Sequence, residues 1–157
     1  MPIRNNVTRL LDARQIVYEL FEFPPEKHSA EVTADLLGVP PEIVYKTLVV
    51  LREAKGKKPL LVMCPAGREL DLKALAASVG EKKLKMAAQR EAEALTGLQV
   101  GGISALALIN RGFEICLSSM AADRPCIHIS AGQRGANLRL SVADLRALTN
   151  ARLVETG

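Results

Sequence analysis

Apolar and polar positions along the chain follow two spacings, one helical and one typical of strands. Apolar residues recur at helical spacing behind a capping residue or before a glycine, which predicts four helices. These helices are expected at Asn5 to Ala13, Ser29 to Leu37, Asp71 to Val79 and Gln89 to Leu95. Ser141-Val142-Ala143-Asp144 has nearly the form of a capping box and predicts a last helix. Pro40-Pro41-Glu42 predicts a short helical turn.

Continuous apolar runs predict the strands. Lys46 to Arg52 and Leu60 to Cys64 are runs typical of buried strands, and the charged segment Glu53 to Lys58 is expected to join them as a hairpin loop. Further strands are predicted at Ile16 to Phe23, Ala105 to Ile109, Phe113 to Leu117, Cys126 to Ser130 and, at an edge, Ala151 to Val154. The pattern therefore predicts a mixed α/β (α+β) fold around a largely antiparallel or mixed sheet.

Composition limits the class of protein. The chain has 157 residues, of which 48% are hydrophobic and 24% charged, as expected for one globular domain spanning residues 1–157. No apolar stretch approaches the roughly 18–20 residues that span a membrane. The first residues lack the apolar core of a signal peptide. We therefore expect a cytoplasmic protein that does not associate with membranes.

The charge is mildly basic, with a formal net charge of +4 and a pI of about 9.1. Two basic clusters contribute: Lys82, Lys83, Lys85 and Arg90, and Lys55, Lys57 and Lys58. Each cluster is either a solvated turn or helix face or a contact for a polyanion. Aromatic residues make up only 3% and tryptophan is absent, which argues against a stacking platform for single-stranded bases.

Cysteine and histidine give little support for a metal site or a thiol nucleophile. Cys64, Cys116 and Cys126 are odd in number and lack the spacing of metal ligands. His28 and His128 are the only histidines, so we expect no metal. Each cysteine lies in or beside an apolar run, which favours a small buried hydrophobe over a catalytic thiol.

A serine nucleophile is the next alternative. Ser104 and Ser130 lie beside or near glycines, with His28 or His128 as possible bases. Neither serine occupies a G-x-S-x-G elbow, and no aspartate is placed to orient a histidine. His128 alternates with apolar neighbours and His28 precedes a helix cap, so both also fit structural roles.

Three short segments carry the remaining chemistry. The segment from Leu98 to Ser104 contains the adjacent glycines Gly101 and Gly102. The segment from Val44 to Leu48 contains Lys46, and the segment from Ser130 to Gly135 contains Arg134 between two glycines. If they converge, backbone N–H groups, an ammonium and a guanidinium form a site for an anionic or ester-bearing ligand. The alternatives are a lysine that extends to solvent at a strand start and an arginine that serves a turn.

These segments resemble the motifs of the YbaK / prolyl-tRNA-synthetase-associated editing domains. The likeness is carried by Gly38 to Leu48, Gly67 to Lys73, Leu98 to Ser104 and Ser130 to Gly135, in that order, and extends from about Val7 to Val154. It implies a trans-editing aminoacyl-tRNA deacylase with no cofactor and with a mixed sheet partly closed into a barrel with flanking helices. The YbaK branch removes cysteine from tRNA(Pro), and related members remove alanine or other small residues.

The resemblance also implies roles and partners. In the cysteine-specific branch the substrate's own thiol is thought to attack, and the lysine that matches Lys46 is essential. The residues expected to catalyse are Lys46, Gly101 and Gly102. Those expected to bind substrate are Tyr45, Thr47, Ile103, Ser104, Ser130, Gly132 and Arg134. The expected partners are the acceptor end of aminoacyl-tRNA and prolyl-tRNA synthetase, with a monomer as the default state.

Two positions depart from the family pattern. Ala105 stands where the glycine motif commonly continues into proline, and Asn137 stands where the cysteine-specific branch often has aspartate. Three alternatives therefore stay open: a deacylase for another small amino acid such as alanine, a catalytically silent module that binds tRNA or a synthetase, and a small-molecule hydrolase or sensor.

Overall fold

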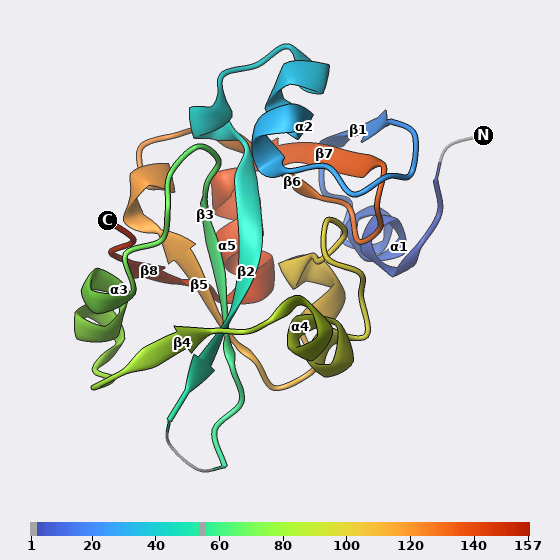
Figure 1. Ribbon diagram of the computed structural model, residues 1–157. Helices are drawn as coiled ribbons and strands as arrows, with labels where there is room; N and C mark the ends of the chain where they lie inside the picture. The colour runs from blue at the N-terminus through green and yellow to red at the C-terminus, as the bar shows by residue number, and fades with distance from the viewer. Residues whose placement is uncertain (1–2, 54–55) are drawn as a thin grey trace.

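The computed structural model describes residues 3–53 and 56–157 of the chain (Figure 1). Its α-helices are α1 (Asn6–Ala13), α2 (Ala30–Leu37), α3 (Leu72–Val79), α4 (Gln89–Thr96) and α5 (Val142–Thr149). Its strands are β1 (Tyr18–Glu22), β2 (Tyr45–Arg52), β3 (Leu60–Pro65), β4 (Leu84–Met86), β5 (Glu114–Ser118), β6 (Cys126–Ser130), β7 (Ala136–Ser141) and β8 (Arg152–Val154). Short 3-10 helices are η1 (Pro41–Ile43), η2 (Ala105–Leu108) and η3 (Ser119–Ala121).

A five-stranded mixed sheet with the order β4-β2-β3-β5-β8 forms one half of the fold. β2 pairs antiparallel with both β3 and β4, whereas β3–β5 and β5–β8 are parallel pairs. Every residue of β3 is buried, as expected for an apolar strand inside a sheet. β2 is less buried than its sequence predicted, because Leu48 and Leu51 remain partly exposed.

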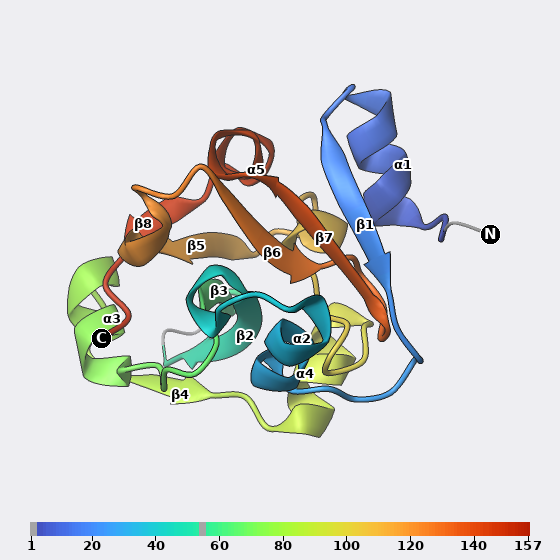
Figure 2. The ribbon, with the colours of Figure 1, turned by 90° about the horizontal axis from the view of Figure 1, so that it is seen from above.

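A three-stranded antiparallel sheet, β1-β7-β6, forms the other half. One isolated parallel bridge between Val44 and His128 links it to the first sheet. Helix α1 lies beside β1 at one end of the molecule, and α3 and β4 lie at the opposite end (Figures 1 and 2). The predicted mixed α/β fold is confirmed. No closed barrel forms among residues 3–53 and 56–157, and the partly closed barrel stays a prediction.

Local capping explains where several helices begin. The side chain of Asn5 accepts hydrogen bonds from the N–H groups of Val7 and Thr8, and Ser29 accepts one from Val32. Asp71 and Ser141 cap α3 and α5 in the same way. These side chains satisfy backbone donors that the first helical turn leaves unpaired, as the sequence predicted.

The structure corrects one predicted strand and adds two strands that the sequence did not predict. Residues Ala105 to Ile109, expected as a strand, contain η2 instead, because the Ser104 hydroxyl accepts a hydrogen bond from the N–H of Leu106 and starts a helical turn. β4 and β7 escaped prediction because lysine and arginine side chains interrupt their apolar positions. Met1, Pro2 and two residues of the expected hairpin loop, Ala54 and Lys55, lie outside the described residues.

The core lies on both faces of β2 and β3. The larger cluster, between the two sheets, includes Leu61, Met63, Leu117, Ile127 and Leu138. A second cluster packs α3 against the other face of the five-stranded sheet. Within the described ranges, no helix combines the length and apolar character that crossing a membrane requires.

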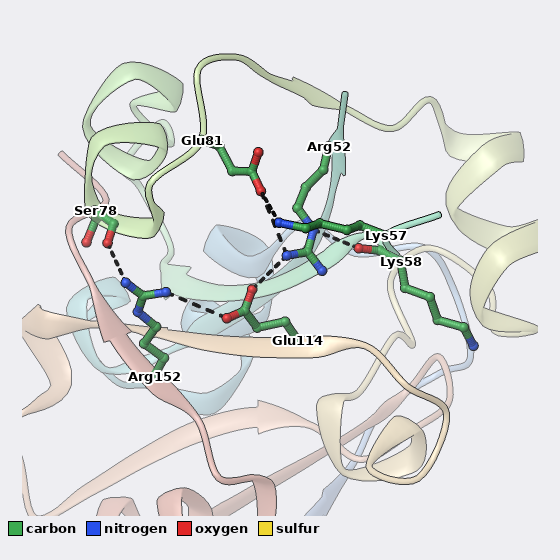
Figure 3. A network of polar contacts seen from close by, with 7 residues as sticks. All are labelled: Arg52, Lys57, Lys58, Ser78, Glu81, Glu114 and Arg152. Atoms are coloured by element: carbon green, nitrogen blue, oxygen red, sulfur yellow. Dashed lines mark hydrogen bonds and ion pairs between the residues drawn. The ribbon is translucent and has the colours of Figure 1, made fainter. Parts of the chain in front are cut away.

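A polar network ties the five-stranded sheet to the segment between α3 and β4 (Figure 3). The guanidinium of Arg52 contacts Glu114 at 2.9 Å and Glu81 at 4.0 Å, and Lys57 contacts Glu81 at 3.4 Å. Arg152 bridges Glu114 and the backbone oxygen of Ser78. Only 11% of the Arg52 side chain and 13% of the Glu81 side chain are exposed, so both charges need these partners.

Truncation of a buried side chain in the central strand β3 should lower the stability of the fold. Leu61 in β3 is fully buried, so Leu61→Ala is expected to lower the free energy of unfolding by about 2–5 kcal/mol through lost burial and a residual cavity. Urea unfolding measures the change. Val17→Ala, at a valine that is 85% exposed, is the control and should change stability by less than about 0.5 kcal/mol.

Candidate functional site

A cavity of about 660 Å³ lies between the two sheets and the segments that connect them. Its walls come from β2, the segment before α2, the β4–α4 connection, the glycine-rich segment and the ends of β6 and β7. The structure thus brings together the three segments that the sequence singled out. Six predicted site residues line the cavity: Tyr45, Lys46, Thr47, Gly101, Ile103 and Ser130. Four lie outside its lining: Gly102, Ser104, Gly132 and Arg134.

Lys46 is the cation that β2 contributes to the cavity. Its side chain is partly buried, and its Nζ donates a hydrogen bond of 2.8 Å to the backbone oxygen of Arg68. An ammonium has three N–H donors, so this bond orients the group and leaves two donors for a ligand. The strand register places Cys64 opposite Lys46.

The neighbouring Tyr45 has a different environment. Its hydroxyl is buried and makes no hydrogen bond with the described residues. Burial is the main cause that raises its pKa, so the phenol stays protonated at neutral pH.

The two adjacent glycines have different functions. Gly101 is exposed at the cavity rim with a φ of +96°, and its N–H makes no hydrogen bond within residues 3–53 and 56–157. Gly102 is buried, and its N–H donates to the backbone oxygen of Gln99 at 2.8 Å. A Cβ on Gly102 would lie 2.7 Å from the backbone nitrogen of Arg134 and 2.7 Å from the carbonyl carbon of Gln133. Gly101 can therefore offer a donor to a ligand, whereas Gly102 permits close contact between two backbones.

Arg134 holds these two segments together. Its Nε donates to the backbone oxygen of Val100 at 2.8 Å, and its guanidinium lies 3.9 Å from Glu93. Glu93 also accepts a 2.8 Å hydrogen bond from the N–H of Val100. Arg134, Glu93 and Val100 thus form a closed polar triangle that ties the loop after β6 to the glycine-rich segment, and substrate binding by Arg134 stays a prediction.

The first helix anchors the loop that contains Gly132. Asn5 donates a 2.8 Å hydrogen bond to the backbone oxygen of Ala131. Gly132 has a φ of +94°, and a Cβ there would lie 2.9 Å from a methyl group of Val7. The Ser130 hydroxyl accepts from the N–H of Gly132 at 3.2 Å, which leaves its own proton free to be donated into the cavity.

His128 and Asn137 form a buried pair beside the cavity. The Nδ1 of His128 lies 3.1 Å from Oδ1 of Asn137, and the imidazole packs against Phe21 with ring centroids 5.4 Å apart. Burial is the main cause that lowers the pKa of His128, so the ring is neutral at neutral pH. Asn137 also lines the cavity.

Sequence reasoning missed two parts of the cavity wall. One runs from Phe23 to Thr33 and includes His28, which is partly buried with Nε2 3.3 Å from the backbone oxygen of Pro24. The other comprises Met86, Ala87, Gln89 and Ala92. No motif marks either segment, because only the packing of α2 and α4 brings them to the cavity.

Of the nucleophiles and bases considered from the sequence, Ser130 and His28 line the cavity, but no hydrogen bond joins them among the described residues. Within these same residues, no cysteine lines the cavity and no serine hydroxyl is hydrogen-bonded to a histidine. Cys64 and Cys116 are buried, as the sequence predicted, whereas Cys126 is partly exposed. No cluster of metal-ligating side chains occurs in the described part of the chain.

Comparison with known proteins gives consistent matches. The model of the aminoacyl-tRNA editing domain matches residues 24–148. The candidate Cys-tRNA(Pro)/Cys-tRNA(Cys) deacylase EbsC of Enterococcus faecalis is 34% identical over 97% of this chain and 92% of its own. The prolyl-tRNA editing protein ProX of Acetoanaerobium sticklandii is 27% identical over 96% and 93%.

One solved structure shows the same fold. The crystal structure of a candidate trans-editing enzyme for prolyl-tRNA synthetase superposes with a TM-score of 0.80 at 24% identity. The superposition covers 99% of this chain and 98% of that one.

Thiol labelling tests the burial of the cysteines. Burial raises the pKa of Cys64 to about 11 and that of Cys116 to about 12, from an ordinary value of 9.0. At pH 8 a thiolate-specific reagent should label only Cys126 rapidly in the folded protein, and all three cysteines after unfolding in urea. Because the folded-state pKa values are raised, the buried thiols stabilise the fold below about pH 9, and this stabilisation is lost as the pH rises toward 11–12.

Substitution of Gly102 tests the contact between the two backbones. Gly102→Ala should lower the free energy of unfolding by about 1–3 kcal/mol, because the added Cβ meets backbone atoms that cannot rotate away. Gly102→Val should cost more than Gly102→Ala, as measured by urea unfolding. Gly97 has no atom within 4 Å of an added Cβ but has a φ of +73°, so substitution there costs stability through backbone strain alone and not through a contact. Equal stability of both Gly102 variants and the native protein would contradict the close approach.

Proposed function

This chain belongs to the aminoacyl-tRNA editing domain family, and we propose that it is a trans-editing deacylase that hydrolyses the ester of mischarged aminoacyl-tRNA. We propose Cys-tRNA(Pro) as its first-choice substrate. The names of EbsC and ProX, which align along nearly their whole length, support this reaction class. The whole chain would act as one editing domain.

The observation that carries the proposal is the composition of the cavity. Lys46 supplies an ammonium, Gly101 an unpaired backbone N–H and Ser130 a hydroxyl proton, all at one cavity between the sheets. These groups stabilise negative charge on oxygen or sulfur, and none of them is an activated nucleophile. The cavity therefore suits a reaction in which the protein stabilises the charge that develops and the substrate provides the attacking group.

Ester cleavage in this cavity follows from those donors. As the carbonyl carbon of the ester is attacked, its oxygen gains negative charge. The N–H of Gly101 and the ammonium of Lys46 are the donors that can hold that charge, each worth about 3–4 kcal/mol when well placed. The bond to the ribose oxygen then breaks and the terminal hydroxyl of the tRNA leaves with a proton. Orientation of Lys46 by the Arg68 backbone oxygen reduces the reorganisation that this step requires.

A cysteinyl ester brings its own nucleophile, as the family resemblance implies. Its thiolate attacks the carbonyl carbon of the same residue, a C–S bond forms, and the C–O bond to the ribose breaks. The product is a cyclic thioester that water can open. Nearby positive charge lowers the pKa of a thiol, so Lys46 can favour the reactive thiolate.

Part of the cavity wall, called the acyl chamber below, is apolar. Ala87, Ala92, Val100 and Ile103 line the cavity together with Leu48 and Val49. Apolar pockets discriminate weakly between residues that differ by one small group, which is the error that a separate hydrolytic site corrects. Asn137 presents a neutral amide at this chamber where the cysteine-specific branch often carries a carboxylate.

We propose two partners. The acceptor end of an aminoacyl-tRNA delivers the ester to the cavity. Prolyl-tRNA synthetase would raise the local concentration of that substrate by forming a complex with the editing domain. The name of ProX refers to the editing of prolyl-tRNA, the product of this synthetase.

The first test is deacylation of Cys-tRNA(Pro), Ala-tRNA(Pro) and Pro-tRNA(Pro) by the native protein and by Lys46→Ala. We expect rapid loss of the cysteine ester and a decrease of about 10²–10³-fold in its rate constant for Lys46→Ala, the usual effect of removing one charge-stabilising donor. Lys73→Ala changes an exposed lysine outside the cavity lining and serves as the control, with an unchanged rate.

The alternatives give different results in the same assay. Preferential loss of the alanine ester would keep the reaction class and change the substrate. Tight tRNA binding with protection of every ester would show a binding module instead. A native rate in Lys46→Ala would overturn the role of Lys46.

A further inference from the structure

The edge strand β4 carries a row of exposed lysines. β4 pairs with β2 on one side only and is the first strand of the five-stranded sheet. Leu84 is buried, whereas Lys82, Lys83 and Lys85 are exposed. These three lysines, called the β4 ridge below, make no hydrogen bond or ion pair with residues 3–53 and 56–157. The sequence left open whether the cluster formed by these lysines and Arg90 is a solvated face or a contact for a polyanion.

Three of the carboxylates next to the ridge have partners inside the protein. Glu81 contacts Arg52 and Lys57, as Figure 3 shows. Glu91 accepts a hydrogen bond from the N–H of Ala88, and Glu93 accepts one from Val100. Glu81, Glu91 and Glu93 are thus turned to internal donors, whereas Glu53, which follows Arg52 where Arg52 pairs with Leu84, is exposed beside the ridge. With three lysines next to this one exposed carboxylate, the ridge keeps a net positive charge. A surface whose only role is solubility usually carries interspersed charges of both signs, unlike the ridge.

The ridge continues directly into the cavity wall. Met86 and Ala87, which follow Lys85, line the cavity, and so does Gln89 at the start of α4. Lys27 lines the same rim and donates a 2.7 Å hydrogen bond to Gln89. At about 3.3 Å per residue, the stretch from Met86 back to Lys82 extends about 13 Å from the rim, enough to contact several successive phosphates.

We propose that the β4 ridge binds the phosphate backbone of the tRNA acceptor arm while the aminoacyl ester occupies the cavity. This rests on the proposed function, because the ester then fixes where the nucleotide chain leaves the protein. Ammonium groups bind phosphates as point charges without reading bases, so the ridge contributes affinity and orientation for any aminoacylated tRNA. Discrimination between amino acids stays with the cavity.

The salt dependence of binding tests the ridge. A tRNA(Pro) transcript without an attached amino acid is titrated with the native protein and with the triple variant Lys82→Gln/Lys83→Gln/Lys85→Gln, over a range of salt concentrations. Loss of three phosphate contacts should reduce the magnitude of the slope of log K against log[salt] by about 2–3, which corresponds to an affinity about 100–1,000-fold lower near 0.1 M salt. Circular dichroism checks that the variant is folded, and each single Lys→Gln variant should reduce the slope by about 0.7–0.9.

A matched control removes the same charge elsewhere. Arg4, Arg9 and Arg14 are exposed in or beside α1, which lies at the opposite end of the molecule from β4 (Figures 1 and 2). The triple Arg→Gln variant changes the net charge by the same amount and should keep the native slope. If both triple variants reduce the slope of log K against log[salt] by the same amount, only net charge matters and the ridge proposal is overturned.

A second readout separates this proposal from the proposed function. The ridge variant should raise the KM for Cys-tRNA(Pro) with little change in kcat, and should hydrolyse the cysteinyl ester of adenosine, which has no acceptor arm, at the native rate. A native protein that hydrolyses no ester contradicts the proposed function, and the binding slopes still test the ridge. A defect that appears only with prolyl-tRNA synthetase present would assign the ridge to a protein contact and overturn the proposal.

Discussion

The cavity depends on a close contact between two backbones that are far apart in sequence. The buried Gly102 lies against Gln133 and Arg134 at a separation that leaves no space for a Cβ. Because the two segments touch there, Arg134 can reach the Val100 carbonyl and Glu93 can complete the polar triangle. That triangle in turn fixes Gly101 at the rim, where its N–H makes no hydrogen bond to any residue that the structure describes. A small contact that permits no side chain therefore determines where the donor of the site lies.

The position of Lys46 depends on a different constraint, the burial of the sheet. β3 is buried along its whole length, so the register of β2 against it is fixed by apolar pairing. This register leaves Lys46 on a partly exposed stretch of β2 next to the cavity, with the Arg68 backbone oxygen as its partner. The ammonium is thus held by a strand that has little freedom to move. Its positive charge is therefore already in position when the reaction begins.

The sequence predicted features that depend on local patterns. The caps at Asn5, Ser29 and Ser141 each follow from a short side chain next to a helical repeat, and the apolar run of β3 predicts a buried strand. The segment after Ser104 was predicted wrongly, because a short apolar run fits a strand or a helical turn equally well. Gly102 and Arg134 make internal contacts that motif spacing cannot reveal, since spacing does not show which way a backbone faces, and their part in substrate binding stays a prediction. The wall from Phe23 to Thr33 carried no signal because only tertiary packing places it.

The order of strands has a consequence for how the chain folds during synthesis. β1 pairs only with β7, so Tyr18 meets Leu140 and the first strand has no sheet partner until most of the chain exists. At about 5–20 residues per second a ribosome needs on the order of 10 s to make the intervening residues. The hydrogen bond from Asn5 to the Ala131 carbonyl forms after a similar delay, because the two residues are about as far apart in sequence. The β2–β3 hairpin can form early, whereas the cavity wall closes late, so newly made chains complete the cavity only near the end of translation.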